Sequence, residues 1–132
     1  MDSIAHRKVY EQIIKENIEY DWFVEVFSMP KGKHKLNGTI EELDEIVEIM
    51  VNCVCSTAKT IRVNGENKPT EIVKAQFLKL NNEHIQYVFD RIYGYATEIT
   101  NMRAYLITTL YNAHMTMNST FQADLRATFG HF

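Results

Sequence analysis

Cysteine, proline and glycine are scarce in this chain of 132 residues, which contains two, two and five of them respectively. Cys53 and Cys55 lie two positions apart in a helical pattern, so their side chains point to different sides and cannot easily form a disulfide. We expect both to be small, buried residues. The glycines are dispersed and form neither the GxGxxG fingerprint nor the P-loop pattern, which excludes nucleotide binding through those loops.

Long apolar runs are also absent. No segment approaches the roughly 18 consecutive apolar residues that are needed to cross a bilayer. The first ten residues lack the apolar core of a signal peptide. We therefore expect a cytoplasmic protein that makes no membrane contact.

Side chains that bind metals or catalyse reactions are present, but they are not arranged for either task. The five histidines are scattered with no ligand spacing between them: His6, His34, His84, His114 and His131. A nucleophile needs a base and an orienting group beside it, and nothing in the spacing of Cys55, His84 and Asp90 singles them out. We predict a protein that is not an enzyme, with no catalytic residue, no cofactor and no metal ion.

Positive charge is concentrated in one block of a chain whose net charge is −3. The net charge is −5 over residues 1–58, +3 over residues 59–79 and −1 over residues 80–132. The cations of the positive block are candidates for contact with a partner or with DNA: Lys59, Arg62, Lys68, Lys74 and Lys79. A solvated surface, or a contact with an acidic helix of the same chain, explains such a block more often than a binding site does.

The remaining composition is that of a globular protein, with 45% hydrophobic and 23% charged residues. Apolar residues recur at helical spacing through most of the chain, and no linker or internal repeat divides it. We predict a single domain over residues 1–132, a compact bundle of about six or seven helices. One helix is expected from about residue 4 to 18 and another from about residue 102. The other helices are expected to begin after an N-cap residue, namely Asp21, Thr39, Thr70, Asn81 or Asn82, and Asn118 or Ser119.

The helix that begins after Thr39 has the strongest signal, because Thr39-Ile40-Glu41-Glu42 matches a capping box. Its acidic residues form a candidate partner face: Glu41, Glu42, Glu45 and Glu48. The short helix before it carries Trp22, Phe23 and Phe27, which we assign to the core, with a docking surface as the alternative. Residues 29–38 between these two helices form a basic loop.

A β-hairpin interrupts the helices between Thr60 and Pro69. Asn64 and Gly65 tolerate positive φ angles and favour a type I′ turn between two short strands. Pro69 has no amide to donate, which is typical of an edge strand or of the end of a strand. An isolated hairpin is only marginally stable, so we expect this one to pack on helices.

Four segments resemble the C-terminal domain of the replication initiator protein A family of Gram-positive plasmids and mobile elements. They are YEQIIKENIEYD at Tyr10–Asp21, the long run at Leu43–Leu80, HIQYVFDRI at His84–Ile92 and NMRAYLITTLYNA at Asn101–Ala113. The resemblance implies a DnaD-like helical fold without enzymatic activity. It also implies that the domain recruits host replication proteins, with primase as the leading candidate, while a winged-helix domain at the N-terminal side binds the origin DNA.

The resemblance leads us to expect a bacterial interaction domain that acts in plasmid replication initiation, either as part of a larger initiator or as a free-standing relative. The alternative is an accessory DNA-binding domain that uses the basic block over residues 59–79. The loop over residues 29–38 and the tail over residues 116–132 differ from the family, so their roles stay open. The identity of the partner, the face that it meets and self-association of the domain also stay open.

Overall fold

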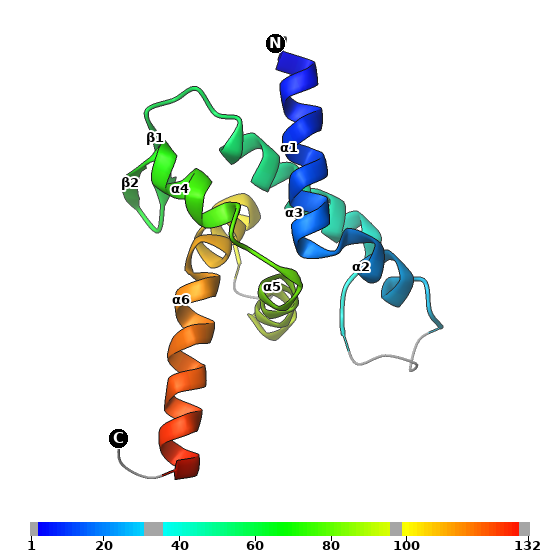
Figure 1. Ribbon diagram of the computed structural model, residues 1–132, viewed down its shortest axis with the longest axis vertical. Coiled ribbons are helices and arrows are strands. Elements are labelled where there is room, and N and C mark those ends of the chain that lie inside the picture. The colour runs from blue at the N-terminus through cyan, green and yellow to red at the C-terminus, as the bar shows by residue number, and fades with distance from the viewer. Residues whose placement is uncertain (1–2, 31–35, 96–98, 130–132) are drawn as a thin grey trace.

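The computed structural model of the chain describes residues 3–30, 36–95 and 99–129 (Figure 1). Within these residues six helices and one two-stranded antiparallel hairpin are present, which confirms the predicted mostly helical class. The elements in chain order are α1 (Ser3–Ile18), α2 (Tyr20–Phe27), α3 (Ile40–Val54), β1 (Thr60–Val63), β2 (Glu66–Pro69), α4 (Thr70–Phe77), α5 (Asn82–Tyr95) and α6 (Met102–Phe129).

Helix α3 is the centre of the fold and contacts α1, α2, α4 and α6. It begins as the capping box predicts, because the Thr39 hydroxyl accepts a hydrogen bond of 3.1 Å from the Glu42 amide. Eight of its residues are buried: Leu43, Ile46, Val47, Ile49, Met50, Val51, Cys53 and Val54. The apolar stripe thus covers most of the helix surface, as a central helix requires.

An aromatic cluster joins α2 to α5. The ring centroids of Phe27 and Phe89 lie 5.2 Å apart, and those of Phe23 and Phe89 lie 6.1 Å apart. Phe23 is fully buried and Phe27 is half-buried, so the assignment of these two residues to the core is confirmed. Trp22 instead packs edge-on against Phe23 and leaves 39% of its surface exposed.

The hairpin follows the prediction closely. Asn64 and Gly65 have φ angles of 51° and 78°, as a type I′ turn requires, and Val63 is paired with Glu66. Val63 is buried in the core, while β1 contacts α4 and α6. Pro69 is the last residue of β2. The contacts with α4 and α6 support a hairpin that would be unstable alone.

Two of the predicted helix starts are wrong. Asp21 lies inside α2 and does not cap it, because the helix begins at Tyr20 after Glu19, a residue in the left-handed conformation. Thr70 is the first residue of α4 and not its cap, because its hydroxyl donates to the Ala58 carbonyl at 2.7 Å. In both places a contact or backbone angle outside the helix overrides the local capping preference.

The C-terminal part of the chain also differs from the prediction. Helix α6 runs without a break from Met102 to Phe129, so no new helix begins at Asn118 or Ser119. Its lower half extends beyond the other elements (Figure 1). In the sequence, Phe121, Leu125 and Phe129 recur at every fourth position, which predicts an apolar face, but their side chains lie outside the described ones. Residues 31–35 of the predicted basic loop also lie outside the described residues.

The two cysteines are free thiols, with Cys53 buried and Cys55 half-buried. Burial raises the pKa of both thiols, which opposes formation of a reactive thiolate. Among the described helices, none combines the length and the apolar character that a membrane span requires.

Candidate functional site

Two of the predicted basic candidates are held by other parts of the chain. The Lys68 ammonium forms an ion pair of 3.1 Å with Glu66 on the same hairpin strand. The Lys74 ammonium lies 4.8 Å from the centre of the Tyr10 ring, which joins α4 to α1. These two lysines are therefore less available to a partner than the sequence alone suggests.

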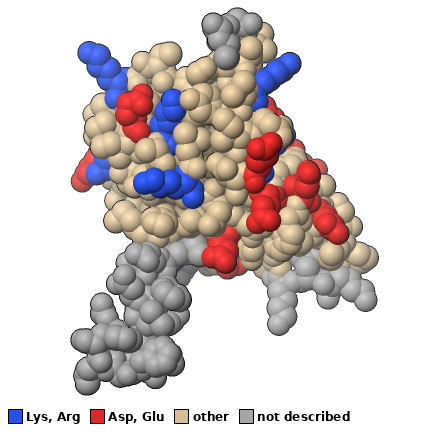
Figure 2. Space-filling view, in the orientation of Figure 1, with Lys and Arg blue, Asp and Glu red and all other residues tan. Residues whose placement is uncertain are grey.

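The other three basic candidates are exposed, namely Lys59, Arg62 and Lys79. The Arg62 guanidinium donates a long hydrogen bond of 3.4 Å to Asn67 on the opposite strand. Figure 2 shows Lys and Arg side chains over the part of the surface that carries the hairpin and α4, with acidic side chains between them. On the face shown in Figure 2, positive and negative side chains thus alternate and do not form a patch of one sign.

The acidic candidates on α3 are likewise divided. Glu48 forms an ion pair of 3.0 Å with Arg7 of α1, and Glu42 accepts a hydrogen bond of 2.5 Å from the Tyr93 hydroxyl of α5. Burial and the Glu42 contact raise the pKa of Tyr93 to about 12. Glu41 and Glu45 remain exposed, with no ion pair to any described residue. Half of this face therefore binds neighbouring helices of the same chain.

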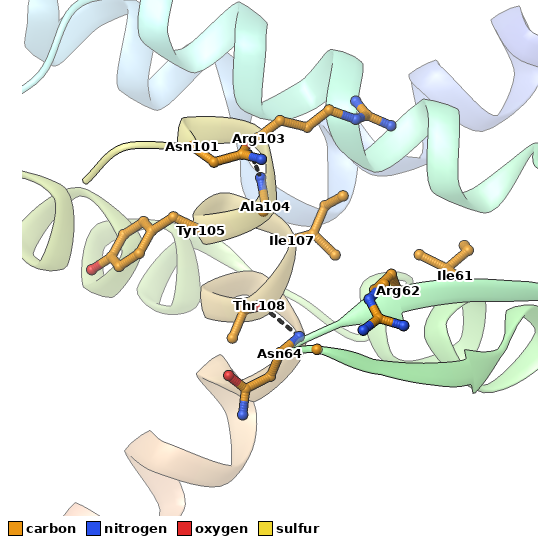
Figure 3. Close-up of a pocket in the computed structure, with 10 residues that line it drawn as sticks. Ile61, Arg62, Asn64, Asn101, Arg103, Ala104, Tyr105, Ile107 and Thr108 are labelled. Carbon is orange, nitrogen blue, oxygen red and sulfur yellow. Dashed lines mark hydrogen bonds between the residues drawn. The ribbon is translucent and has the colours of Figure 1, made fainter.

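A hollow of about 710 Å³ opens between the hairpin and the first turns of α6 (Figure 3). We call it the arginine hollow. The described residues that line it are Ile61, Arg62, Asn64, Gly65, Asn101, Arg103, Ala104, Tyr105, Ile107 and Thr108. They include two arginines and no acidic residue, so the lining carries a net positive charge.

Helix α6 adds further positive potential at this place. The Asn101 side chain caps the helix by accepting a hydrogen bond of 3.1 Å from the Ala104 amide. The first turn contains no acidic residue, and Arg103 lies next to the positive end of the helix dipole. None of the ion pairs among the described residues involves Arg62 or Arg103. Within the described part of the chain, the charge in the hollow is therefore not neutralised by an ion pair.

The floor of the hollow is apolar. Ile61 of β1 is half-buried and Ile107 of α6 is buried, and both border the same space in Figure 3. The Tyr105 ring points away from the hairpin, and its hydroxyl lies 3.4 Å from the Arg91 carbonyl. The arginine hollow thus combines an apolar floor with cationic and amide groups, a combination typical of binding sites.

The tip of the hairpin is attached to α6 at the edge of the hollow. The Asn64 amide donates a hydrogen bond of 2.9 Å to the Thr108 hydroxyl (Figure 3). We expect the Thr108→Val variant to lose about 1 kcal/mol in free energy of unfolding and to exchange the Asn64 amide proton faster. Urea unfolding and hydrogen exchange measure the two effects. The Thr108→Ser variant keeps the hydroxyl and should match the wild type; equal losses in both variants would contradict the contact.

Sequence reasoning identified Arg62 and overlooked Arg103, Asn101 and Thr108. One local signal points to Arg103, since a cation in the first turn of a helix opposes the helix dipole. Its position opposite the hairpin is a consequence of tertiary packing between β1 and α6. That packing joins residues about 40 positions apart, which no local pattern reveals.

Residues 1–128 match a protein family that is described as a family of unknown function, DUF6017. The chain belongs to this family. No curated protein and no solved structure matches the chain. The arginine hollow lies wholly within the segment that the family match covers.

His84 has a structural role in this family member. The Asn81 amide donates to Nδ1 of His84 at 3.0 Å, and the His84 amide donates to the Asn81 side chain at 3.3 Å. This reciprocal pair is a capping box in which histidine replaces glutamate. Nε2 of His84 lies 3.4 Å from Nδ1 of His114 on α6. No hydrogen bond among the described residues joins His84 to Cys55 or Asp90.

The lowered pKa of His84 in this capping box predicts that the free energy of unfolding is smaller in acid. Burial, and secondly His114, lower the pKa of His84 below 6.5, against the opposing effect of Glu83. The unfolded chain then binds a proton at a higher pH than the folded chain does, so the free energy of unfolding falls as the pH drops below 6.5. The His84→Gln variant keeps an acceptor for the cap and should show a shallower pH dependence in urea unfolding. An identical pH dependence in both proteins would contradict this role.

Proposed function

We propose that this chain is a non-enzymatic interaction domain of a plasmid replication initiator, which recruits host replication proteins to the origin. Primase is the leading candidate for the partner, followed by the proteins that load the replicative helicase. The proposal is supported by the resemblance of four segments in the same order to the C-terminal domain of the replication initiator protein A family. The helical fold with one hairpin agrees with the DnaD-like domain that the resemblance implies.

The arginine hollow is the observation that carries the interaction role. Its two arginines are exposed and form no ion pair with the described residues, although they lie beside an apolar floor. Stability of the fold does not require such an arrangement, because surface charges contribute little to folding. A surface that the fold does not need, and that combines charge with apolar area, is suited to a partner protein.

Affinity capture with purified host proteins tests this function. The chain is immobilised and exposed separately to primase, to the helicase and to helicase-loading proteins at micromolar concentrations. We expect at least one of them to be retained, and retention should be competed by the free chain. Failure to retain any of these proteins would contradict the proposed function.

An accessory DNA-binding role is the second candidate, because Lys59, Arg62, Lys79 and Arg103 are all exposed. Binding through phosphate contacts weakens steeply as the salt concentration rises. The test is a titration of single-stranded and double-stranded oligonucleotides at several salt concentrations. Binding at low salt that falls steeply with salt would favour this role over the first. Absence of binding at low salt, or a flat salt response, would remove it.

A further inference from the structure

At Arg62 the outer edge of β1 faces the arginine hollow. In a hairpin closed by a two-residue turn, Val63 and Glu66 exchange backbone hydrogen bonds, so the N–H and C=O groups of Arg62 point away from β2. The amide of Asn64 points to the same side and donates to Thr108 on α6. The backbone groups of Arg62 therefore face the space between β1 and α6, and none of the described residues forms a hydrogen bond with them.

An unpaired strand edge is a template for another extended chain. The hollow beside this edge is bordered by Ile61 and Ile107, which offer apolar contact, and by Arg62 and Arg103, which offer positive charge. In strand addition, backbone hydrogen bonds provide affinity and the side-chain contacts provide specificity. The edge of β1 supplies the backbone hydrogen bonds, and the lining of the hollow supplies the side-chain contacts.

We propose that the arginine hollow binds an extended acidic segment of a partner protein. The segment adds to β1 as a third strand through the backbone of Arg62, and its carboxylates face Arg62 and Arg103. An apolar side chain of the segment packs between Ile61 and Ile107. This inference rests on the proposed function as an interaction domain, and it names both the surface and the chemistry of the partner.

Nucleic acid fits the hollow less well than an acidic segment does. Binding of single strands relies on aromatic side chains on which the bases stack. The aromatic residue among the described lining residues is Tyr105, and its ring points away from the hairpin. A strand edge pairs with a polypeptide backbone and offers no such match to phosphates.

A second copy of this chain fits less well for a different reason. An acidic hollow of about 640 Å³, lined by Glu16, Glu19, Asp21 and Trp22 among others, complements the arginine hollow in charge. It is formed by α1, α2 and the turn between them, so it has no extended backbone to offer to β1. Contact between two different surfaces of identical chains also gives rings or open filaments, not a closed dimer.

The test uses a synthetic peptide of eight residues that alternates Glu and Val, with a matched peptide that alternates Gln and Val. We expect the Glu peptide to bind, and the Gln peptide to bind at least about tenfold more weakly, because the carboxylate contacts are lost. A third peptide with proline at the central positions cannot donate backbone hydrogen bonds and should also bind more weakly. In NMR spectra the Arg62 amide should shift and become protected from exchange.

Variants of the chain locate the binding site. The Arg62→Glu/Arg103→Glu variant should lose the Glu peptide, with affinity reduced at least about tenfold. Lys79→Glu is the matched control, because Lys79 is an exposed cation outside the hollow, and it should bind the peptide as the wild type does. Unfolding in urea shows whether the variants remain folded.

Several outcomes would overturn the inference. It fails if no Glu peptide binds at millimolar concentration, or if the double variant binds as the wild type does. It also fails if a single-stranded oligonucleotide displaces the peptide from the hollow, or if the double variant abolishes a self-association detected by sedimentation. Retention of a replication protein by the double variant at the wild-type level would refute this site and leave the proposed function intact. Peptide binding without retention of any replication protein would refute the function and leave the site intact.

Discussion

Replacing Phe89 by alanine is expected to lower the free energy of unfolding by about 3–5 kcal/mol. The Phe89 side chain is fully buried, and its ring contacts Phe23 and Phe27, so its removal leaves a cavity between α2 and α5. A domain of this kind has about 5–15 kcal/mol of stability in total. The variant should therefore unfold at a much lower urea concentration, as measured by circular dichroism.

Ile72 provides the matched control for Phe89. Its side chain is 47% exposed on α4, so the Ile72→Ala variant should change the free energy of unfolding by less than about 0.5 kcal/mol. A Phe89→Ala variant that is as stable as Ile72→Ala would show that the aromatic cluster is not part of the core.

Replacing Gly38 by alanine is expected to destabilise the protein by about 1–3 kcal/mol. A Cβ atom at this position would lie 2.6 Å from Cζ of Phe27 and 2.8 Å from Cε1 of Phe89, well inside contact distance. Both rings are held by the aromatic cluster, so neither can move away without disturbing α2 or α5. Urea unfolding of the variant measures the loss.

Gly94 gives the opposite expectation with the same substitution. It lies within α5, and a Cβ atom there meets nothing within 4 Å. The Gly94→Ala variant should gain up to about 1 kcal/mol, because alanine favours a helix more than glycine does. A Gly38→Ala variant at least as stable as the wild type would contradict the close packing around Gly38, and a loss of stability in Gly94→Ala would contradict the open space there.

Much of the fold follows from signals that act within a few residues. Asn64 and Gly65 determine the hairpin, because both residues must adopt positive φ angles to close a two-residue turn. The capping box at Thr39 determines where α3 begins, since its hydroxyl replaces a missing backbone acceptor. Such signals depend on the backbone preferences of neighbouring residues, so they can be read from the local sequence.

Other features depend on contacts between distant parts of the chain. Glu42 completes the capping-box pattern in the sequence, yet its carboxylate binds Tyr93 of α5. The continuous helix α6 has a simpler cause, because no glycine or proline lies between Met102 and Phe129. Residues such as Asn118 and Ser119 favour a cap only where another residue ends the preceding helix. The sequence therefore predicted a helix start at Asn118 or Ser119, although no glycine or proline before these residues ends α6.

In the candidate site, too, some features follow from the local sequence and others from contacts between distant residues. The basic block around the hairpin is visible in the sequence, and Arg62 was recognised within it. Three features are not visible there: the pairing of Lys68 with Glu66, the contact of Lys74 with Tyr10, and the place of Arg103 in the lining of the hollow. They arise from the packing of α1, α4 and α6 around the hairpin, so the composition of the site depends on tertiary structure.

Calorimetric titration of host primase into the wild-type chain and into the Arg62→Glu/Arg103→Glu variant tests the central claim most directly. The claim is that this domain recruits a replication protein through the arginine hollow. We predict micromolar or tighter binding to the wild type, and binding weakened at least about tenfold in a variant that unfolds at the same urea concentration. Equal affinity of the two proteins for primase, or no heat of binding to the wild type, would contradict it.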